Sequence, residues 1–389
     1  MIYDFDNVPE RRGTSSLKYD FPVRRGKPED VLPLWVADMD FPAPPCVLEA
    51  LAERVKHGIF GYSEPDQAYL DTLQTWFGER FGWNIDPQWL IPTPGVVNAI
   101  YLAAKAFTAP GDGIVIQQPV YPPFEASVVQ TGRHLLVNEL VSDGEKYGID
   151  FADFESKIKQ SKMFVLCSPH NPVGRVWTRD ELEQMGHICL RHGVVVISDE
   201  IHQDFVFPGH RHLVFADLDP RFADITITCT SPSKTFNLAG LQLSNIFISK
   251  KALRDKFTEA YEDCGLSQPP VMGLVSCQAA YAGGAPWLDE LLIYLEGNMD
   301  HIGEFLRTRV NKIKTIKPDG TYLAWLDFRD FNLSPDELDD LVANKAKLWL
   351  NSGPSFGAGG AGFLRMNTAC PNSIVHEALE RLERVFADR

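Results

Sequence analysis

The stretch Gly193-Val-Val-Val-Ile-Ser-Asp199 decides the fold, because it is an unbroken apolar run that ends in a carboxylate. Such a run is typical of a strand buried on both faces of a parallel sheet, whereas a half-exposed strand would alternate apolar and polar residues. Similar runs, separated by helix-length segments such as 178–191, cover residues 113–117, 163–167, 225–230 and 244–249. The alternation predicts an α/β domain over residues 45–290, with a mostly parallel sheet covered by helices on both faces.

The pattern changes after about residue 290. The expected elements there are a helix over 286–316, a strand over 321–328, a helix over 334–345 that Ser334 and Pro335 begin, and a closing helix over 372–386. They predict a smaller α+β domain over residues 291–389. Residues 1–44 are rich in Pro, Arg and Asp, and we expect an extended arm that contributes to the smaller domain and to the active site.

Composition excludes several classes of protein. The chain has 389 residues and a formal net charge of −15, which argues against a nucleic acid or an anionic membrane as partner. Its seven cysteines form no Cys-x-x-Cys pair, so we expect free thiols in a reducing compartment. The N-terminus lacks the basic and apolar stretches of a signal peptide, and no apolar run reaches the ~18 residues of a membrane-spanning helix. We therefore expect a cytoplasmic protein.

Three polar residues follow apolar runs and define a candidate site. Asp199 ends the run quoted above, Asn171 lies in Ser168-Pro-His-Asn-Pro-Val-Gly174, and Lys234 lies in Ser231-Pro-Ser-Lys-Thr-Phe-Asn237. Because ligands of open α/β sheets bind at the carboxyl ends of strands, we expect these side chains to meet at one edge. A buried carboxylate there requires a cationic partner, and a buried lysine titrates lower, which favours Schiff-base chemistry.

With Arg365 far downstream, these residue types are the set needed to hold pyridoxal phosphate (PLP). Lys234 would form a Schiff base with the aldehyde. Asp199 would keep the ring nitrogen protonated, so that the ring can accept electrons from a carbanion. Asn171 would hydrogen-bond the ring oxygen, and Arg365 would bind a substrate carboxylate through two parallel hydrogen bonds.

Two further segments fit this cofactor. Gly95-Val96-Val97 opens a helix that runs to about Phe107, and a helix N-terminus that begins at a glycine offers backbone N–H groups to a phosphate. Tyr121 follows the strand over 113–117, where its ring could lie against the pyridine.

Two other interpretations of these residues are weaker. Ser231-x-x-Lys234 matches the serine–lysine pair of penicillin-binding enzymes, but the Ser-Asp-Asn and Lys-Thr-Gly motifs of those enzymes are absent from the sequence. His202, and His210 with His212, invite a metal site. We expect ordinary loop histidines there and no metal.

With these residues assembled, the chain resembles the fold-type I PLP enzymes, the aspartate-aminotransferase-like superfamily, over nearly its whole length. Within that superfamily it is most similar to the cystathionine β-lyase and cysteine-S-conjugate β-lyase branch, the MalY/PatB group. The motifs that carry the narrower resemblance are Asn7 with Arg11–Asp20, Leu34–Phe41, Ser233–Leu241, Phe363–Asn367 and Ala369–Pro371.

The resemblance implies a role for each candidate residue. The catalytic residues would be Lys234 and Tyr121, and the substrate would be bound by Arg365 and Asp38. The phosphate would be bound by Val96, Val97, Ser231 and Ser233, and by Tyr62 of a neighbouring subunit, which implies a homodimer with shared active sites. Two positions depart from the general aminotransferase pattern: Gln242 stands where many of those enzymes have an arginine, and Lys18-Tyr19-Asp20 replaces the usual Lys-Trp-Asp.

The activity that the resemblance implies is β-elimination, which cleaves cystathionine or a related cysteine S-conjugate to a thiol, pyruvate and ammonia. An aminotransferase would use the same cofactor residues and is the main alternative. A regulatory protein on the same scaffold is a weaker one, because every residue of the cofactor set is present. The sequence leaves the preferred thioether open.

Overall fold

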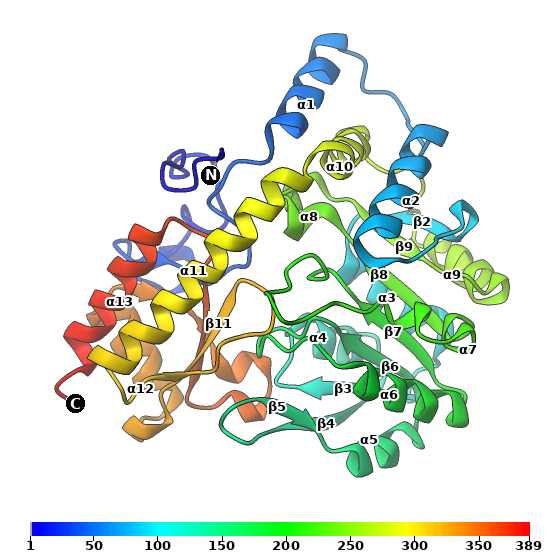
Figure 1. Ribbon diagram of the computed structural model, residues 1–389. Helices are drawn as coiled ribbons and strands as arrows, with labels where there is room; N and C mark the ends of the chain where they lie inside the picture. The colour runs from blue at the N-terminus through cyan, green and yellow to red at the C-terminus, as the bar shows by residue number, and fades with distance from the viewer. Residues whose placement is uncertain (1) are drawn as a thin grey trace.

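The computed structural model describes residues 2–389, and a large sheet forms its central layer (Figure 1). The strand order is β2-β9-β8-β7-β6-β3-β4-β5. These strands are β2 (Leu90–Thr93), β3 (Gly113–Gln118), β4 (His134–Ser142), β5 (Tyr147–Ile149), β6 (Ser161–Cys167), β7 (Val195–Asp199), β8 (Thr226–Thr230) and β9 (Ser244–Phe247). The neighbours from β4 through β3, β6 and β7 to β8 are parallel, β2 runs in the same direction as these strands, and only β9 and β5 run against them. The predicted mostly parallel sheet is confirmed.

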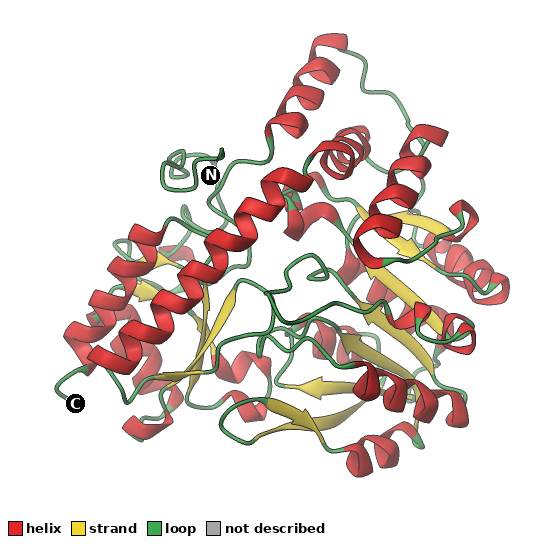
Figure 2. Ribbon diagram, viewed as in Figure 1, coloured by secondary structure: helices red, strands yellow, loops and turns green. Residues whose placement is uncertain are grey.

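Helices cover both faces of this sheet (Figure 2). On one face lie α3 (Val96–Phe107), α4 (Pro123–Gln130) and α9 (Lys251–Asp263), and on the other α5 (Phe151–Ile158), α6 (Arg179–His192) and α7 (Pro220–Ala223). Strand β6 shows why its sequence is apolar without interruption. Met163 and Val165 belong to the core under the first three helices, whereas Phe164 and Leu166 belong to the core under the other three.

A smaller antiparallel sheet has the strand order β10-β11-β14-β13. Its strands are β10 (Lys314–Thr315), β11 (Leu323–Asp327), β13 (Asn351–Ser352) and β14 (Phe363–Asn367), and the helices near it are α11 (Ala285–Arg309), α12 (Pro335–Asp340) and α13 (Asn372–Phe386). The N-terminal arm joins this part of the chain, because β1 (Leu32–Pro33) pairs in parallel with β12 (Leu348–Trp349). The proposed domain boundaries at residues 44 and 290 stay predictions.

Two helices are shorter than their sequence patterns predict. The helix expected over 286–316 ends at Arg309, because Val310 and Ile313 turn into the core and Thr315 pairs with Leu326 of β11. The helix expected over 334–345 begins as predicted, with Ser334 and Glu337 forming a capping box. It is α-helical only to Asp340 and continues as a π-helical turn over Leu341–Lys345.

The remaining α-helices pack on one another beyond the N-terminal end of α11 (Figure 1). They are α1 (Pro45–His57), α2 (Gln67–Phe81), α8 (Pro232–Thr235) and α10 (Val271–Gly283), and short 3-10 helices cover Val23–Arg25, Pro87–Trp89, Phe215–Asp217, Ala239–Leu241, Arg329–Phe331, Gly353–Phe356 and Ala358–Gly360. Helix α1 extends away from the body of the molecule, and Val47 is its one buried residue among those described. All seven cysteines are free, as expected. In the described part of the chain, every helix is too short or too polar to cross a membrane.

Candidate active site

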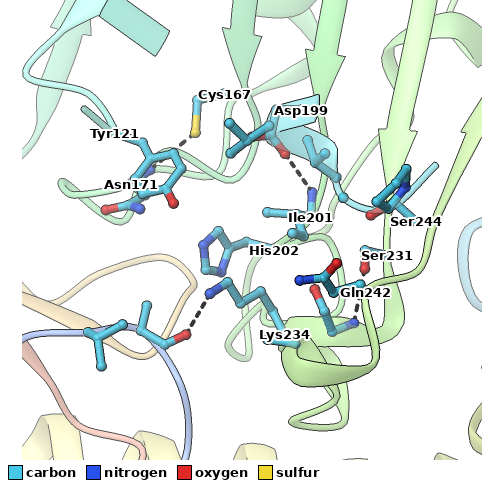
Figure 3. A pocket seen from close by; sticks show the side chains of 18 of the residues that line it. Tyr121, Cys167, Asn171, Asp199, Ile201, His202, Ser231, Lys234, Gln242 and Ser244 are labelled. Atoms are coloured by element: carbon cyan, nitrogen blue, oxygen red, sulfur yellow. Dashed lines mark hydrogen bonds between the residues drawn. The ribbon is translucent and has the colours of Figure 1, made fainter. Parts of the chain in front are cut away.

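A cavity of about 320 Å³ lies where β6, β7 and β8 end. Asn171 follows β6, Asp199 ends β7 and Lys234 lies on α8 just after β8, and all three side chains line the cavity (Figure 3). Arg365 reaches the same cavity from β14 of the smaller sheet. The structure therefore brings together the four residues that the sequence singled out from different parts of the chain.

Lys234 is positioned by a capped helical turn. Ser231 is the N-cap of α8, and its Oγ accepts a hydrogen bond from the Ser233 amide at 3.1 Å. The Lys234 ammonium donates to the carbonyl oxygen of Ala37 at 2.6 Å. Burial lowers the pKa of Lys234 to about 8, and the Arg365 guanidinium acts in the same direction. A neutral amine, the form that attacks aldehydes, is therefore well populated under mildly alkaline conditions.

Asp199 is a buried carboxylate without a cationic partner. It is 4% exposed, and Oδ1 accepts a hydrogen bond from the Ile201 amide at 3.1 Å. Within residues 2–389 its carboxylate forms no ion pair. Burial raises the pKa of this carboxyl to about 7, because a low-dielectric environment disfavours its charged form. A cation placed beside Asp199 would reverse that effect.

Arg365 is a buried cation that, like Asp199, forms no ion pair within residues 2–389. Its guanidinium donates from Nη1 to Asn171 Oδ1 at 3.1 Å and from Nη2 to the Trp35 carbonyl at 2.7 Å. Its Nε is buried without a partner, and no carboxylate in the described chain pairs with it. Burial lowers the pKa of Arg365 to about 10. A buried guanidinium of this kind is suited to an anionic ligand.

Helix α3 directs its N-terminus at the cavity. Gly95 is the N-cap and has no side chain to satisfy the first amides, so the N–H groups of Val96 and Val97 remain for a ligand. A β-carbon at Gly95 would meet no atom within 4 Å, which leaves open space over these amides. Ser231 and Ser233 also line the cavity, but the Ser231 hydroxyl donates to the Leu243 carbonyl at 2.7 Å.

Three other candidates lie at different distances from the centre of the site. Tyr121 lines the cavity beside Asn171 (Figure 3), and its pKa is raised by burial. Asp38 does not line the cavity, and Arg11 donates hydrogen bonds to its two carboxylate oxygens at 3.2 and 2.6 Å. Tyr62 is 95% exposed and lies outside the cavity of its own chain.

Residues 35–41, which we call the strap, cross the cavity with their main chain held from several sides. Its carbonyl oxygens accept hydrogen bonds from Lys234, Asn237, Tyr322, Arg365 and Asn367. The N-terminal arm holds the strap through Asp40, which receives hydrogen bonds from Arg11, Lys18 and Tyr19. The Lys18 side chain is fully buried beside this carboxylate.

The sequence interpretation missed part of the cavity wall. Gln242, Ser244 and Asn351 line it, and so does His202, which we had expected to be an ordinary loop histidine. That expectation was wrong, because the chain turns tightly after β7 and returns His202 to the edge occupied by Asp199 (Figure 3). The signal was its position three residues after a carboxylate that ends a buried strand.

Comparisons with known proteins agree with this geometry. The family model for aminotransferase class I and II matches residues 29–382. The chain is 46% identical over 386 residues to cystathionine beta-lyase PatB of Bacillus subtilis (strain 168), covering 99% of this chain and 100% of PatB. It is 34% identical to protein MalY of Escherichia coli (strain K12), covering 98% of each. The crystal structure of cystalysin from Treponema denticola, which contains pyridoxal 5'-phosphate, matches with a TM-score of 0.96 at 38% identity over 100% of both chains.

Proposed function

Because this chain belongs to the family of class I and II aminotransferases, we propose from its relatives and its cavity that it is a PLP-dependent carbon–sulfur β-lyase. Its substrate is cystathionine or a related cysteine S-conjugate, and its products are a thiol, pyruvate and ammonia. The full-length similarity to PatB supports the reaction, and the PLP in cystalysin supports the cofactor.

One observation carries the cofactor assignment. A single cavity holds a buried carboxylate without a cation, a buried guanidinium without a carboxylate, a helix N-terminus with free amides and a buried amine. PLP with an amino acid complements all four: its protonated ring nitrogen suits Asp199, its phosphate suits the amides of Val96 and Val97, and its aldehyde suits Lys234. The substrate carboxylate suits Arg365. The residues present therefore fit the cofactor.

When bound, PLP supplies an electron-accepting ring conjugated to the substrate nitrogen. Asp199 keeps the ring nitrogen protonated, because it is the buried anion at that end of the cavity. Arg365 fixes the substrate carboxylate and so sets which bond at Cα faces Lys234. The Asn171 amide oxygen already accepts from Arg365, which leaves its Nδ2 group to donate to the ring oxygen.

Lys234 is the base of the reaction. With a lowered pKa, its Nζ takes the proton from the substrate Cα as the Cα–H bond breaks. The Cβ–S bond then breaks, and the sulfur leaves with the electron pair. Lys234 can pass this proton to the departing sulfur, which then leaves as the thiol. Hydrolysis of the remaining amino acid fragment gives pyruvate and ammonia.

The decisive test is pyruvate release from L-cystathionine by the purified protein, with no 2-oxo acid added and with the visible spectrum recorded. A visible cofactor band together with pyruvate supports the proposal. A band with no pyruvate from any S-conjugate, but with amino transfer once a 2-oxo acid is supplied, would make the protein an aminotransferase. Gln242, an amide where an arginine is common in aminotransferases, favours the first outcome.

A homodimer with shared sites also belongs to this proposal. Helix α1 and the loop after it carry apolar side chains that are more than half exposed: Val55 57%, Ile59 64%, Phe60 56% and Tyr62 95%. A patch of this kind favours burial against another subunit. Tyr62 would then reach the phosphate end of the partner's cavity.

Mixing two variants, each with impaired activity, tests this arrangement. Lys234→Ala removes the base, and Tyr62→Ala weakens phosphate binding in the partner's site. If sites are shared, a heterodimer has one site with both changes and one with neither, so mixing after dissociation should restore activity. Mixtures that stay inactive although heterodimers form would contradict a shared site.

The free state of all seven cysteines supports a cytoplasmic location for this enzyme, because thiols persist in reducing compartments.

A further inference from the structure

A second cavity, of about 370 Å³, lies at the opposite end of β8 from Lys234 and shares no wall residue with the active-site cavity. Thr226 and Thr228 of β8 line it, together with Phe247 and Ser249, which end and follow β9. Because β9 runs against β8, the carboxyl end of β9 and the amino end of β8 meet at the same edge of the sheet. The second cavity is therefore separate from the chemistry proposed above, and its role does not depend on that proposal.

One face of β8 forms the floor of the second cavity. Thr228 lies directly opposite Phe247 in the pairing with β9, so both side chains project from the same face of the sheet. Ile227 and Cys229 point to the other face, where they belong to the core under α3, α4 and α9. The cavity thus lies on the face covered by α7, and residues of α7 form part of its wall.

A buried hydroxyl on this floor has no partner. The hydroxyls of Thr226 and Ser249 donate to the carbonyl oxygens of Phe222 and Ala223 at 2.6 and 2.8 Å. Thr228 is 1% exposed, and its Oγ1 forms no hydrogen bond within residues 2–389. A buried polar group without a partner costs free energy, and a ligand that forms a hydrogen bond with it removes that cost. The Thr228 hydroxyl therefore indicates a ligand with a hydrogen-bonding group.

Aromatic side chains form another part of the wall. Trp83, Trp89 and Phe247 line the second cavity. The ring of Trp83 packs edge-to-face with Phe247 at 5.3 Å between centroids, and it lies 6.4 Å from the Trp89 ring at an angle of 36°. The faces of aromatic rings carry negative potential, so they attract cations. These rings offer an apolar surface that favours a cationic ligand over an anionic one.

The charged side chains on the wall are both acidic. Asp217 and Asp224 line the second cavity, and among the described residues no basic side chain does. Asp224 pairs with Lys250 at 3.2 Å, whereas Asp217 forms no ion pair within residues 2–389. Partial burial raises the pKa of the Asp217 carboxyl, and the Arg179 charge offsets only part of this effect. The wall thus retains a carboxylate for a cationic ligand to neutralise.

We propose that the second cavity binds a small alkylated ammonium that carries a hydroxyl or a similar hydrogen-bonding arm, as choline does. The ammonium lies against the rings of Trp83 and Trp89 beside Asp217, and the arm reaches the Thr228 hydroxyl. Tryptophan faces recognise quaternary ammonium groups through the attraction between a cation and the π system. A volume of about 370 Å³ is near the lower end of the range for small-molecule sites, which suits a ligand of this size.

The test is isothermal titration calorimetry of the PLP-loaded protein with choline and with the neutral alcohol in which carbon replaces the choline nitrogen. A quaternary ammonium cannot form an imine with the PLP aldehyde, so the titration measures non-covalent binding. We expect choline to bind at one site per chain and the neutral alcohol to bind about tenfold more weakly.

Variants of the wall locate the binding site. Trp89→Leu keeps an apolar side chain and removes the ring, and it should weaken choline binding about tenfold. Asp217→Asn should weaken it about threefold, because this carboxylate is exposed to solvent on one side. Asp263→Asn is the matched control, since Asp263 is an exposed carboxylate outside the cavity, and its dissociation constant should equal that of the wild type.

Two threonine variants test the unpartnered hydroxyl. Thr228→Val removes it at nearly equal volume, so the urea midpoint should not fall, whereas Thr226→Val removes a hydroxyl that donates to Phe222, and the midpoint should fall. Thr228→Val should also weaken choline binding and leave the binding of tetramethylammonium, which has no arm, unchanged. Equal losses of stability in the two variants would show that the Thr228 hydroxyl already has a partner, and would contradict the proposal.

The remaining outcomes are equally direct. Wild-type protein without saturable choline binding overturns the proposal, and so does equal binding of the neutral alcohol, since the cavity would then select shape alone. Choline binding that survives when Trp89→Leu and Asp217→Asn are combined belongs to another site and overturns it as well. If Trp89→Leu fails to fold, Asp217→Asn against its control carries the test, and weaker binding is required. None of these results alters the lyase proposal, which pyruvate release tests separately.

Discussion

Replacing Asp199 with asparagine should make the cofactor-free protein more stable, although it disables the enzyme. The carboxylate is buried and no cation in the described chain pairs with it, so folding removes a charge from water, and the Ile201 amide and the Lys234 charge offset only part of that cost. Asparagine keeps an oxygen that can accept the Ile201 amide and carries no charge. The substitution thus removes an unfavourable term and retains the local hydrogen bond.

The size of the effect follows from the pKa of Asp199, which burial raises from 3.8 to about 7. A group whose pKa is raised in the folded state favours folding below its unfolded pKa and loses that contribution as the pH rises to its folded pKa. The carboxylate should therefore destabilise the apoprotein by ~1.5 kcal/mol at pH 5 and by about 4 kcal/mol at pH 8, at ~1.4 kcal/mol per unit. The gain in apoprotein stability from Asp199→Asn should therefore grow from pH 5 upwards and level off above pH 7.

Urea unfolding of cofactor-free wild type and variant, at pH 5 and pH 8 and at equal protein concentration, measures this difference. A variant that is no more stable than the wild type at pH 8, or whose advantage does not grow between the two pH values, would refute the reasoning. With PLP bound the sign should reverse, because the ring nitrogen then pairs with Asp199. The holo form of the variant should lose turnover and should gain less stability from PLP than the wild type does.

Three further outcomes follow from the site. Arg365→Lys should lower kcat/KM by ~30- to 100-fold, because an ammonium cannot form two parallel bonds to a carboxylate, and steady-state kinetics with an S-conjugate would show it. The rate at which the apoprotein binds PLP covalently should rise with pH through a midpoint near 8, because Lys234 reacts as the neutral amine. Stopped-flow absorbance measures this rate, and a midpoint near 10.5 would show that the pKa of the lysine is not lowered. Arg11→Met should destabilise the protein by ~1.5–3 kcal/mol and raise KM, because Asp38 and Asp40 lose their shared partner; urea unfolding and initial rates check both, and unchanged values would contradict a role for the arm.

The sequence predicts the large sheet and its carboxyl edge well, because each key residue follows an uninterrupted apolar run, and such a run is typical of a buried strand. Asn171, Asp199 and Lys234 could be placed together for that reason, and their convergence is confirmed by the structure. Arg365 lies on a different sheet, so no local pattern links it to them, and only residue chemistry and the family resemblance pointed to it.

Tertiary contacts explain the rest. His202 was misjudged because its location depends on a turn held by Glu200 and Asp204, two buried side chains with distant partners. The helix predicted to reach residue 316 stops early because pairing with β11 outweighs helix propensity in its last residues. Asp38 was expected at the substrate, and its contact with Arg11 could not be seen in sequence; a substrate role stays a prediction.

The strap has a consequence for engineering. It contacts Lys234 and Arg365 through main-chain carbonyls, so the path of the peptide positions these two side chains, while Asp40 anchors the strap to the N-terminal arm. The side chain of Trp35 lines the cavity and stacks on Trp349 with ring centroids 4.4 Å apart, and replacing it leaves the carbonyl contacts to Lys234 and Arg365 available. Libraries of substitutions at these two tryptophans could change which S-conjugate binds without changing the residues that hold the cofactor. A proline substitution in the strap would instead alter its main-chain path and lower activity toward every substrate alike.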